Sequence, residues 1–90
     1  MVKRINVLIY GDVTGVGFRA WTLRQAQDKQ LTGWVRNADM DKVEAVFEGE
    51  SEKVNEMIEL CKKGPDVGWV EKVELKEEKV LGDKNFEIRF

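Results

Sequence analysis

The sequence contains no histidine and only one cysteine, Cys61, among its 90 residues. Histidine is the side chain that changes charge near neutral pH, and it is the commonest protein ligand of metal ions. Its absence excludes metal sites built on histidine and nucleophiles that a histidine activates. No set of cysteines or carboxylates has the spacing of metal ligands either, so we expect no metal. The lone cysteine excludes an internal disulfide and favours a cytoplasmic protein.

The chain also lacks a long hydrophobic run and an excess of charge of one sign. No apolar segment approaches the roughly 18 residues of a membrane-spanning helix, and no signal-peptide core follows the first four residues. The 15 basic residues are balanced by 17 acidic ones. Nucleic-acid binders normally show a basic excess on at least one face, so we expect neither a nucleic acid nor a membrane as partner. We expect residues 1–90 to form a single, monomeric domain.

The apolar pattern predicts five strands and two helices. Apolar residues alternate or run together in the segments predicted as strands, at 3–10, 32–37, 43–48 and 85–90. A further strand is predicted within 67–80, centred on 70–75. Helical spacing predicts one helix at 18–29 and another that starts at Ser51, a predicted N-cap, and stops at Gly64-Pro65. Cys61 shares one face of the second helix with Val54, Met57 and Ile58. It is therefore expected in the core.

The order β-α-β-β-α-β, followed by a short C-terminal strand, is that of an α+β ferredoxin-like sandwich. We expect one antiparallel sheet with both helices on one face. The string Gly15-x-Gly17-x-x-Ala20 matches the dinucleotide fingerprint, but the second strand turns directly into a hairpin, which excludes that fold. RNA-binding domains share the sandwich. Segment 42–49 lacks the aromatic pattern that they carry on the third strand, so RNA binding is not favoured.

The stretch from Gly11 to Arg19 joins the first strand to the first helix and is predicted as an anion site. Gly15 and Gly17 allow consecutive N–H groups to point into one concavity, and the helix start adds donors and a positive dipole end. Arg19 can close over a phosphate or carboxylate. Asn37, near the end of the second strand, can project its amide toward this loop. Spacing alone leaves a plainer interpretation open, with a tight glycine connection, a solvated arginine and a turn-forming asparagine.

Together these residues closely resemble the acylphosphatase family. The resemblance rests on Gly11-x-Val13-x-Gly15-Val16-Gly17-Phe18-Arg19 and, after the first helix, on Gly33-Trp34-Val35-Arg36-Asn37. Val43-Glu44, Glu48-Gly49 and Gly64-Pro65 match as well, so it covers essentially the whole chain. The resemblance implies hydrolysis of acyl phosphates without a metal or an organic cofactor. A non-catalytic acylphosphatase-like domain that only binds phosphate is the alternative.

The resemblance also implies a role for each site residue. Arg19 matches the arginine that binds the phosphate, and Asn37 matches the asparagine that positions the attacking water. Inorganic phosphate or sulfate is expected to occupy the same place. The phosphate cradle would be formed by the backbone N–H groups of Gly15, Val16, Gly17, Phe18 and Arg19. Such chemistry suits a chain without histidine, because an acyl phosphate leaves as a carboxylate that needs no general acid at neutral pH.

Four positions depart from the family pattern. Asp12 stands where a basic residue is common, and Thr14 stands where glutamine is frequent. Asp12 is expected to weaken anion affinity unless it points outward. Gln30 and Asp41 replace glycines after the first helix and in the hairpin. We expect both to adopt left-handed or turn conformations, at a cost in stability rather than chemistry.

Overall fold

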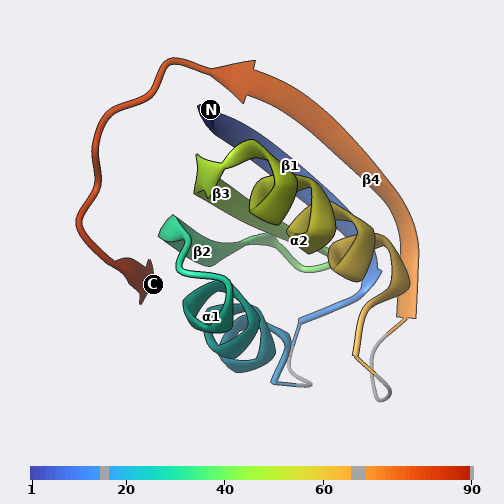
Figure 1. The fold of residues 1–90 in the computed structure, drawn as a ribbon. Coiled ribbons are helices and arrows are strands. Elements are labelled where there is room, and N and C mark those ends of the chain that lie inside the picture. The colour runs from blue at the N-terminus through green and yellow to red at the C-terminus, as the bar shows by residue number, and fades with distance from the viewer. Residues whose placement is uncertain (15–16, 66–68, 90) are drawn as a thin grey trace.

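The computed structural model describes residues 1–14, 17–65 and 69–89. Its elements follow the predicted order (Figure 1). They are β1 (Val2–Asp12), α1 (Phe18–Asp28), β2 (Thr32–Asp39), β3 (Lys42–Glu50), α2 (Ser51–Lys63), β4 (Trp69–Glu78) and β5 (Phe86–Ile88). β1, β2 and β3 extend by one or two residues beyond the predicted segments, because pairing with the neighbouring strands continues at their ends. β4 lies within the predicted segment 67–80.

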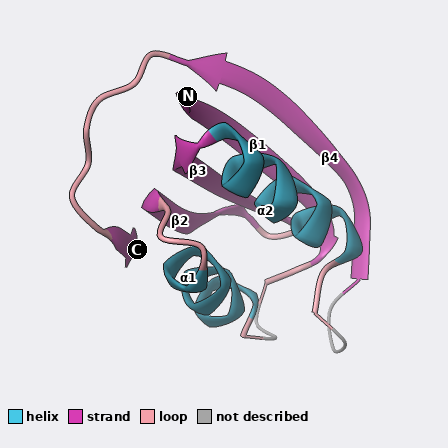
Figure 2. Ribbon diagram, in the orientation of Figure 1, coloured by secondary structure: helices cyan, strands magenta, loops and turns pink. Residues whose placement is uncertain are grey.

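The five strands form one sheet in the order β4-β1-β3-β2-β5, and both helices cover the same face of it (Figure 2). The predicted ferredoxin-like α+β fold is therefore confirmed. The sheet is mixed rather than wholly antiparallel, because β5 pairs in parallel with β2. The chain leaves β4 at one edge, crosses to the opposite edge and re-enters the sheet from the same end (Figure 1). A strand that re-enters this way runs antiparallel to β4 and hence parallel to β2.

The core lies between the sheet and the helices. Alternate residues of β1 and β3 point into it, and α2 adds one apolar face. Cys61 is fully buried there, as predicted, and this burial raises the pKa of its thiol to about 12. Each large apolar side chain buried in this way stabilises the fold by about 1.5–3 kcal/mol. The fully buried residues contributed by these three elements include Val7, Ile9, Val43, Ala45, Phe47, Val54 and Met57.

Ser51 is the first residue of α2 and not its N-cap. The cap position is held by Glu50, whose side chain makes no capping hydrogen bond. Ser51 instead donates two hydrogen bonds to the carbonyl oxygen of Met1, from its backbone nitrogen and from Oγ, each at 2.7 Å. β1 and β3 pair as far as their outer ends, Val2 and Glu50, which brings Met1 close to Ser51. The serine hydroxyl therefore ties the start of the helix to the residue before β1.

Gln30 has a left-handed backbone with φ of 59°, as predicted for a residue that replaces a glycine. Among the described residues it is the only one other than glycine with a positive φ. Asp41 lies in the hairpin turn without a positive φ. The hairpin contains a register shift between Asn37 and Asp39, and the Asp39 carboxylate accepts a hydrogen bond from the Met40 N–H at 2.9 Å.

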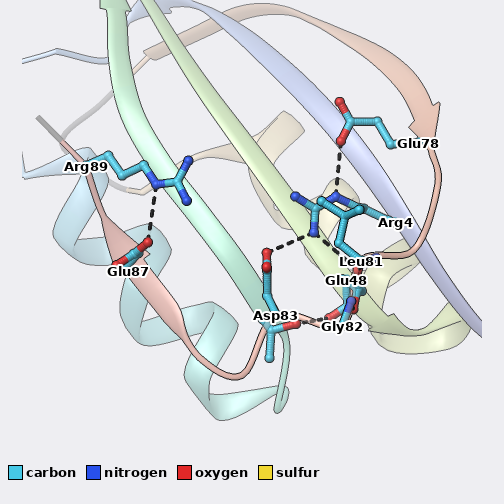
Figure 3. Close-up of polar contacts among 9 residues, drawn as sticks. Arg4, Glu48, Glu78, Leu81, Gly82, Asp83, Glu87 and Arg89 are labelled. Atoms are coloured by element: carbon cyan, nitrogen blue, oxygen red, sulfur yellow. Dashed lines mark hydrogen bonds and ion pairs between the residues drawn. The ribbon is translucent and has the colours of Figure 1, made fainter.

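A buried ion cluster lies on the sheet face opposite the helices (Figure 3). Arg4 on β1 and Glu48 on β3 are 4% and 5% exposed, and Nη1 of Arg4 lies 3.2 Å from Oε1 of Glu48. Glu78 and Asp83 complete the partners of Arg4, at 3.1 and 2.9 Å. Burial alone would lower the pKa of Arg4, but hydrogen bonds to these three carboxylates outweigh it and raise that pKa. The guanidinium therefore stays charged inside the protein.

Candidate active site

The start of α1 forms one side of the candidate site. Gly17 holds the N-cap position with φ of 76°, a left-handed conformation that glycine adopts without steric cost. The Trp21 N–H donates to the Gly17 carbonyl at 2.9 Å and so closes the first turn. Phe18 is 1% exposed, and the centroid of its ring lies 5.3 Å from the centroid of the Trp21 ring. This buried ring anchors the helix start, and the next residue, Arg19, is only partly buried.

Two hydrogen bonds tie the end of β1 to the β2–β3 hairpin. The Gly11 N–H donates to the Asp41 carbonyl at 3.1 Å, and the Thr14 hydroxyl donates to the Met40 carbonyl at 2.7 Å. The hairpin is thereby held beside Gly11 and Thr14. Thr14, whose effect could not be inferred from the sequence, has this positioning contact. The exposed side chain of Asp12 does not line the pocket described below.

Asn37 approaches the same place from β2. It pairs with Val43, and the preceding core residue on its face is the fully buried Val35, which pairs with Ala45. Alternation along the strand therefore directs Asn37 to the helix-covered face. Asn37 itself is exposed, because it stands near the end of the strand. An exposed amide at the rim of a buried layer is available to a ligand or a water molecule.

The structure brings the start of α1 and Asn37 together around one pocket of about 170 Å³. Pockets for drug-sized ligands are typically about 300–1,000 Å³, so this one suits a small ligand. Of the predicted site residues, Gly17, Phe18, Arg19 and Asn37 line it. Gly15 and Val16 lie outside the described residues. The pocket thus gathers residues from the N-terminus of α1, Arg19 among them, and Asn37 of β2.

Three further lining residues were not predicted from the sequence, namely Val13, Ala20 and Ile88. Val13 and Ala20 lie within two residues of predicted site residues, and this adjacency was the available signal. Ile88 comes from β5, and nothing in its local pattern indicates that its strand lies beside β2. Its parallel partner is Val35, which brings it next to the face that carries Asn37.

The electrostatics of the pocket favour an anion. Arg19 supplies a positive charge, and the N-terminus of α1 supplies N–H donors and the positive end of the helix dipole. Among the described lining residues none is acidic. Over residues 1–14, 17–65 and 69–89, no group of three or more cysteine or carboxylate side chains is arranged to hold a metal ion. No helix in that part of the chain is long and apolar enough to cross a membrane.

Comparison with known proteins adds independent findings. A family model described as Acylphosphatase matches residues 5–88. A relative from Syntrophobacter fumaroxidans, described as an acylphosphatase, is 46% identical over 98% of this chain and 92% of its own length. The solved structure of an acylphosphatase from Coxiella burnetii has a TM-score of 0.94 at 34% identity, covering 98% of this chain and 93% of that one. Full-length HypF, crystallised in the phosphate- and nucleotide-bound form, matches all of this chain with a TM-score of 0.88 at 26% identity, over 12% of its own length.

Proposed function

The chain belongs to the acylphosphatase family, and we propose that its reaction takes place in the pocket lined by Arg19 and Asn37. The protein is an enzyme that hydrolyses acyl phosphates to a carboxylate and inorganic phosphate. The observation that carries the proposed location is the convergence of the α1 N-terminus, Arg19 and Asn37 on one small pocket.

In this proposal the phosphoryl group sits at the start of α1. Arg19 binds its peripheral oxygens, which carry the charge in the ground state and in the transition state. Backbone N–H groups of the loop are proposed to donate hydrogen bonds to the remaining oxygens, because donors fixed in advance need no reorganisation during a reaction. The residues of this cradle are Gly15, Val16, Gly17, Phe18 and Arg19, of which Gly17 to Arg19 line the pocket.

Asn37 is proposed to hold the attacking water through its side-chain amide. The water oxygen forms a bond to phosphorus, the bond between phosphorus and the acyl oxygen breaks, and the carboxylate leaves with the electron pair. The proton of the water passes to a phosphate oxygen of the substrate itself. A carboxylate has an ordinary pKa of about 4 and leaves unprotonated at neutral pH. No histidine or other general acid is then required.

We further propose that residues 1–90 act as one monomeric domain in the cytoplasm, without a metal or an organic cofactor. All five strands belong to a single sheet, and the one cysteine is buried in its core. Inorganic phosphate or sulfate is proposed to occupy the phosphoryl position, because both offer the same tetrahedral oxygens to Arg19 and the helix N-terminus.

The non-catalytic alternative, a domain that only binds phosphate, is less well supported. This chain covers 92% of the Syntrophobacter acylphosphatase and 93% of the Coxiella one, so it corresponds to nearly the whole of each. It corresponds to only 12% of the much longer HypF chain.

Initial rates with benzoyl phosphate, measured beside calorimetric binding of inorganic phosphate, test the two roles. Arg19→Ala is expected to lose activity and phosphate affinity together. Asn37→Ala is expected to lose most of kcat while phosphate binds nearly as well as to the wild type. Arg24→Ala, on the same helix, and Asn55→Ala, on α2, are the matched controls and are expected to keep both properties.

Three outcomes would overturn this assignment. Near wild-type kcat in Asn37→Ala would show that this side chain does not hold the attacking water. Unchanged phosphate binding in Arg19→Ala would show that this guanidinium does not bind the phosphate. A wild-type protein that binds phosphate but never hydrolyses benzoyl phosphate would favour the non-catalytic alternative.

A further inference from the structure

The apolar part of the pocket has one large side chain that a ligand can reach. Val13 and Phe18 are each 1% exposed, so their surfaces are already covered by the core. Ala20 offers only a methyl group. Ile88 packs against the core but stays partly exposed. Of the described apolar residues that line the pocket, Ile88 is therefore the one that combines a large side chain with partial exposure.

We propose that Ile88 receives the acyl group of the substrate and that Glu48 is the positioning residue that holds Ile88 in place. The inference rests on the proposed function, because it takes Arg19 and the helix N-terminus to hold the phosphoryl group. An acyl phosphate has a highly charged end and an acyl end. Once the charged end lies on the polar side of the pocket, an apolar acyl group gains by packing on the apolar side.

The position of Ile88 depends on a strand that pairs over only three residues. β5 pairs with β2 through Gly33 with Phe86 and through Val35 with Ile88. Hydrogen bonds on either side of these pairs, from the Gly33 N–H to the Asn85 carbonyl and from the Arg89 N–H to the Val35 carbonyl, measure 3.0 and 2.8 Å. So short a pairing is weak by itself and needs support from the segment that delivers it.

The connection from β4 to β5 uses most of its reach in crossing the sheet. It crosses from one edge of the sheet to the other, past β1, β3 and β2 (Figure 1). Neighbouring strands lie about 4.8 Å apart, so the crossing spans roughly 19 Å. The eight steps from Glu78 to Phe86 reach at most about 28 Å when fully extended. A contact in the middle of this connection therefore restricts where β5 can lie.

Glu48 makes that contact. Its Oε1 accepts a hydrogen bond from the Leu81 N–H at 2.8 Å, and its Oε2 accepts one from the Gly82 N–H at 2.9 Å (Figure 3). Nη1 of Arg4 donates a hydrogen bond to Oε1 of Glu48 at 3.2 Å and another to Oδ2 of Asp83, in the connection, at 2.9 Å. Both oxygens of Glu48 thus act as acceptors for the connection, which an amide in the same place cannot do.

Substitution of Ile88 tests the acyl contact with two substrates of different size, benzoyl phosphate and acetyl phosphate. Ile88→Ala is expected to lower kcat/KM for benzoyl phosphate roughly tenfold, mostly through KM, because a lost packing contact removes uniform binding. For acetyl phosphate the change is expected to be less than about twofold. Ile88→Val keeps the branched side chain, and its kcat/KM for benzoyl phosphate is expected to lie between those of the wild type and Ile88→Ala. Inhibition by inorganic phosphate is expected to be unchanged in both variants.

Substitution of Glu48 tests the positioning role. Glu48→Gln keeps the volume and replaces one acceptor oxygen with an amide NH2 group, a donor that then faces an N–H donor. It is expected to lower the benzoyl-to-acetyl ratio of kcat/KM in the same direction as Ile88→Ala. Glu50→Gln, at the exposed end of the same strand, is the control and is expected to leave the ratio unchanged. In the double variant that combines Glu48→Gln with Ile88→Ala, the two effects on the ratio are expected not to add. Both substitutions act through the same contact, that of Ile88 with the acyl group.

The outcomes separate this inference from the proposed function. If Ile88→Ala leaves the benzoyl-to-acetyl ratio of kcat/KM unchanged, whether or not both values fall, Ile88 does not receive the acyl group. If Glu48→Gln lowers thermal stability but keeps the wild-type ratio, its role is structural only and the positioning claim is wrong. If the wild type hydrolyses neither substrate, the proposed function itself fails.

Discussion

Arg36 donates two hydrogen bonds to a single oxygen of Glu44, from Nε at 2.9 Å and from Nη2 at 2.6 Å to Oε1. The other oxygen accepts a hydrogen bond from Nδ2 of Asn6 at 2.9 Å. The three residues lie on β2, β3 and β1, so one carboxylate joins three neighbouring strands. Arg36 directly precedes Asn37, and this link therefore steadies the part of β2 that carries the proposed water-binding residue.

We expect Glu44→Gln to destabilise the protein at neutral pH but not at low pH. Partial burial alone would raise the pKa of Glu44, but hydrogen bonds from Asn6 and Arg36 outweigh it and hold that pKa below its ordinary value. A carboxylate with a lower pKa in the folded state stabilises the fold above its unfolded-state pKa. That contribution is lost as the pH falls through the folded-state pKa.

Urea unfolding of the wild type and of Glu44→Gln, at neutral pH and at about pH 3, measures the difference in their free energies of unfolding. The free energies of unfolding should differ at neutral pH and converge in acid. Glu77→Gln on β4 provides a control with an exposed glutamate. A gap between wild type and Glu44→Gln that stays constant across this range would contradict the prediction.

Hydrolysis of benzoyl phosphate is expected to be independent of divalent metal ions. The sequence has no histidine, and the described residues contain no cluster of cysteines or carboxylates suited to a metal. Initial rates before and after treatment with excess EDTA, and again after addition of Mg²⁺, measure this directly. Activity that disappears with EDTA and returns with Mg²⁺ would overturn the expectation.

Inorganic phosphate and sulfate are expected to raise the melting temperature. A ligand that binds only the folded state stabilises it by about 2.7 kcal/mol when its concentration is 100 times its Kd. Thermal unfolding should be followed across a series of phosphate concentrations at constant ionic strength. Arg19→Ala should show a smaller rise, which separates binding at the pocket from a general salt effect. A wild-type Tm that does not respond to phosphate would rule out the anion site.

Gln30→Gly is expected to stabilise the protein by up to about 1 kcal/mol, because glycine removes the steric cost of a left-handed backbone. The gain is limited by the greater flexibility of glycine in the unfolded chain. Arg24→Gly is a control, since Arg24 is an exposed residue in the interior of α1. There glycine should destabilise by about 1 kcal/mol. Equal destabilisation of both variants in urea unfolding would refute this explanation of the Gln30 conformation.

The local pattern of the sequence predicts the helices and strands, the ferredoxin-like fold and an anion site in the loop between the first strand and the first helix. The family resemblance predicts that Arg19 and Asn37 share one site, and in the structure both line one pocket. Ile88 could not be assigned to that pocket, because the parallel pairing of β5 with β2 joins segments far apart in the chain.

The buried ion cluster was also invisible in the sequence. Arg4 and Glu48 stand at the ends of alternating strands, where charged residues usually face solvent. In the structure, Glu78 of β4 and Asp83 of the crossing connection both contact Arg4, and the same connection donates two N–H groups to Glu48. Their burial is therefore a property of the topology and not of the local pattern.

The burial of Cys61 gives the protein a chemical reporter of its own opening motions. Thiol reagents react with the thiolate, and a thiol with a pKa of about 12 that is shielded by the core is almost never in that form. Alkylation must then wait for α2 to detach from the sheet or for the whole fold to open. Because the chain has no second cysteine, labelling under native conditions reports only on openings that expose the inner face of α2, by detachment of the helix or by opening of the whole fold.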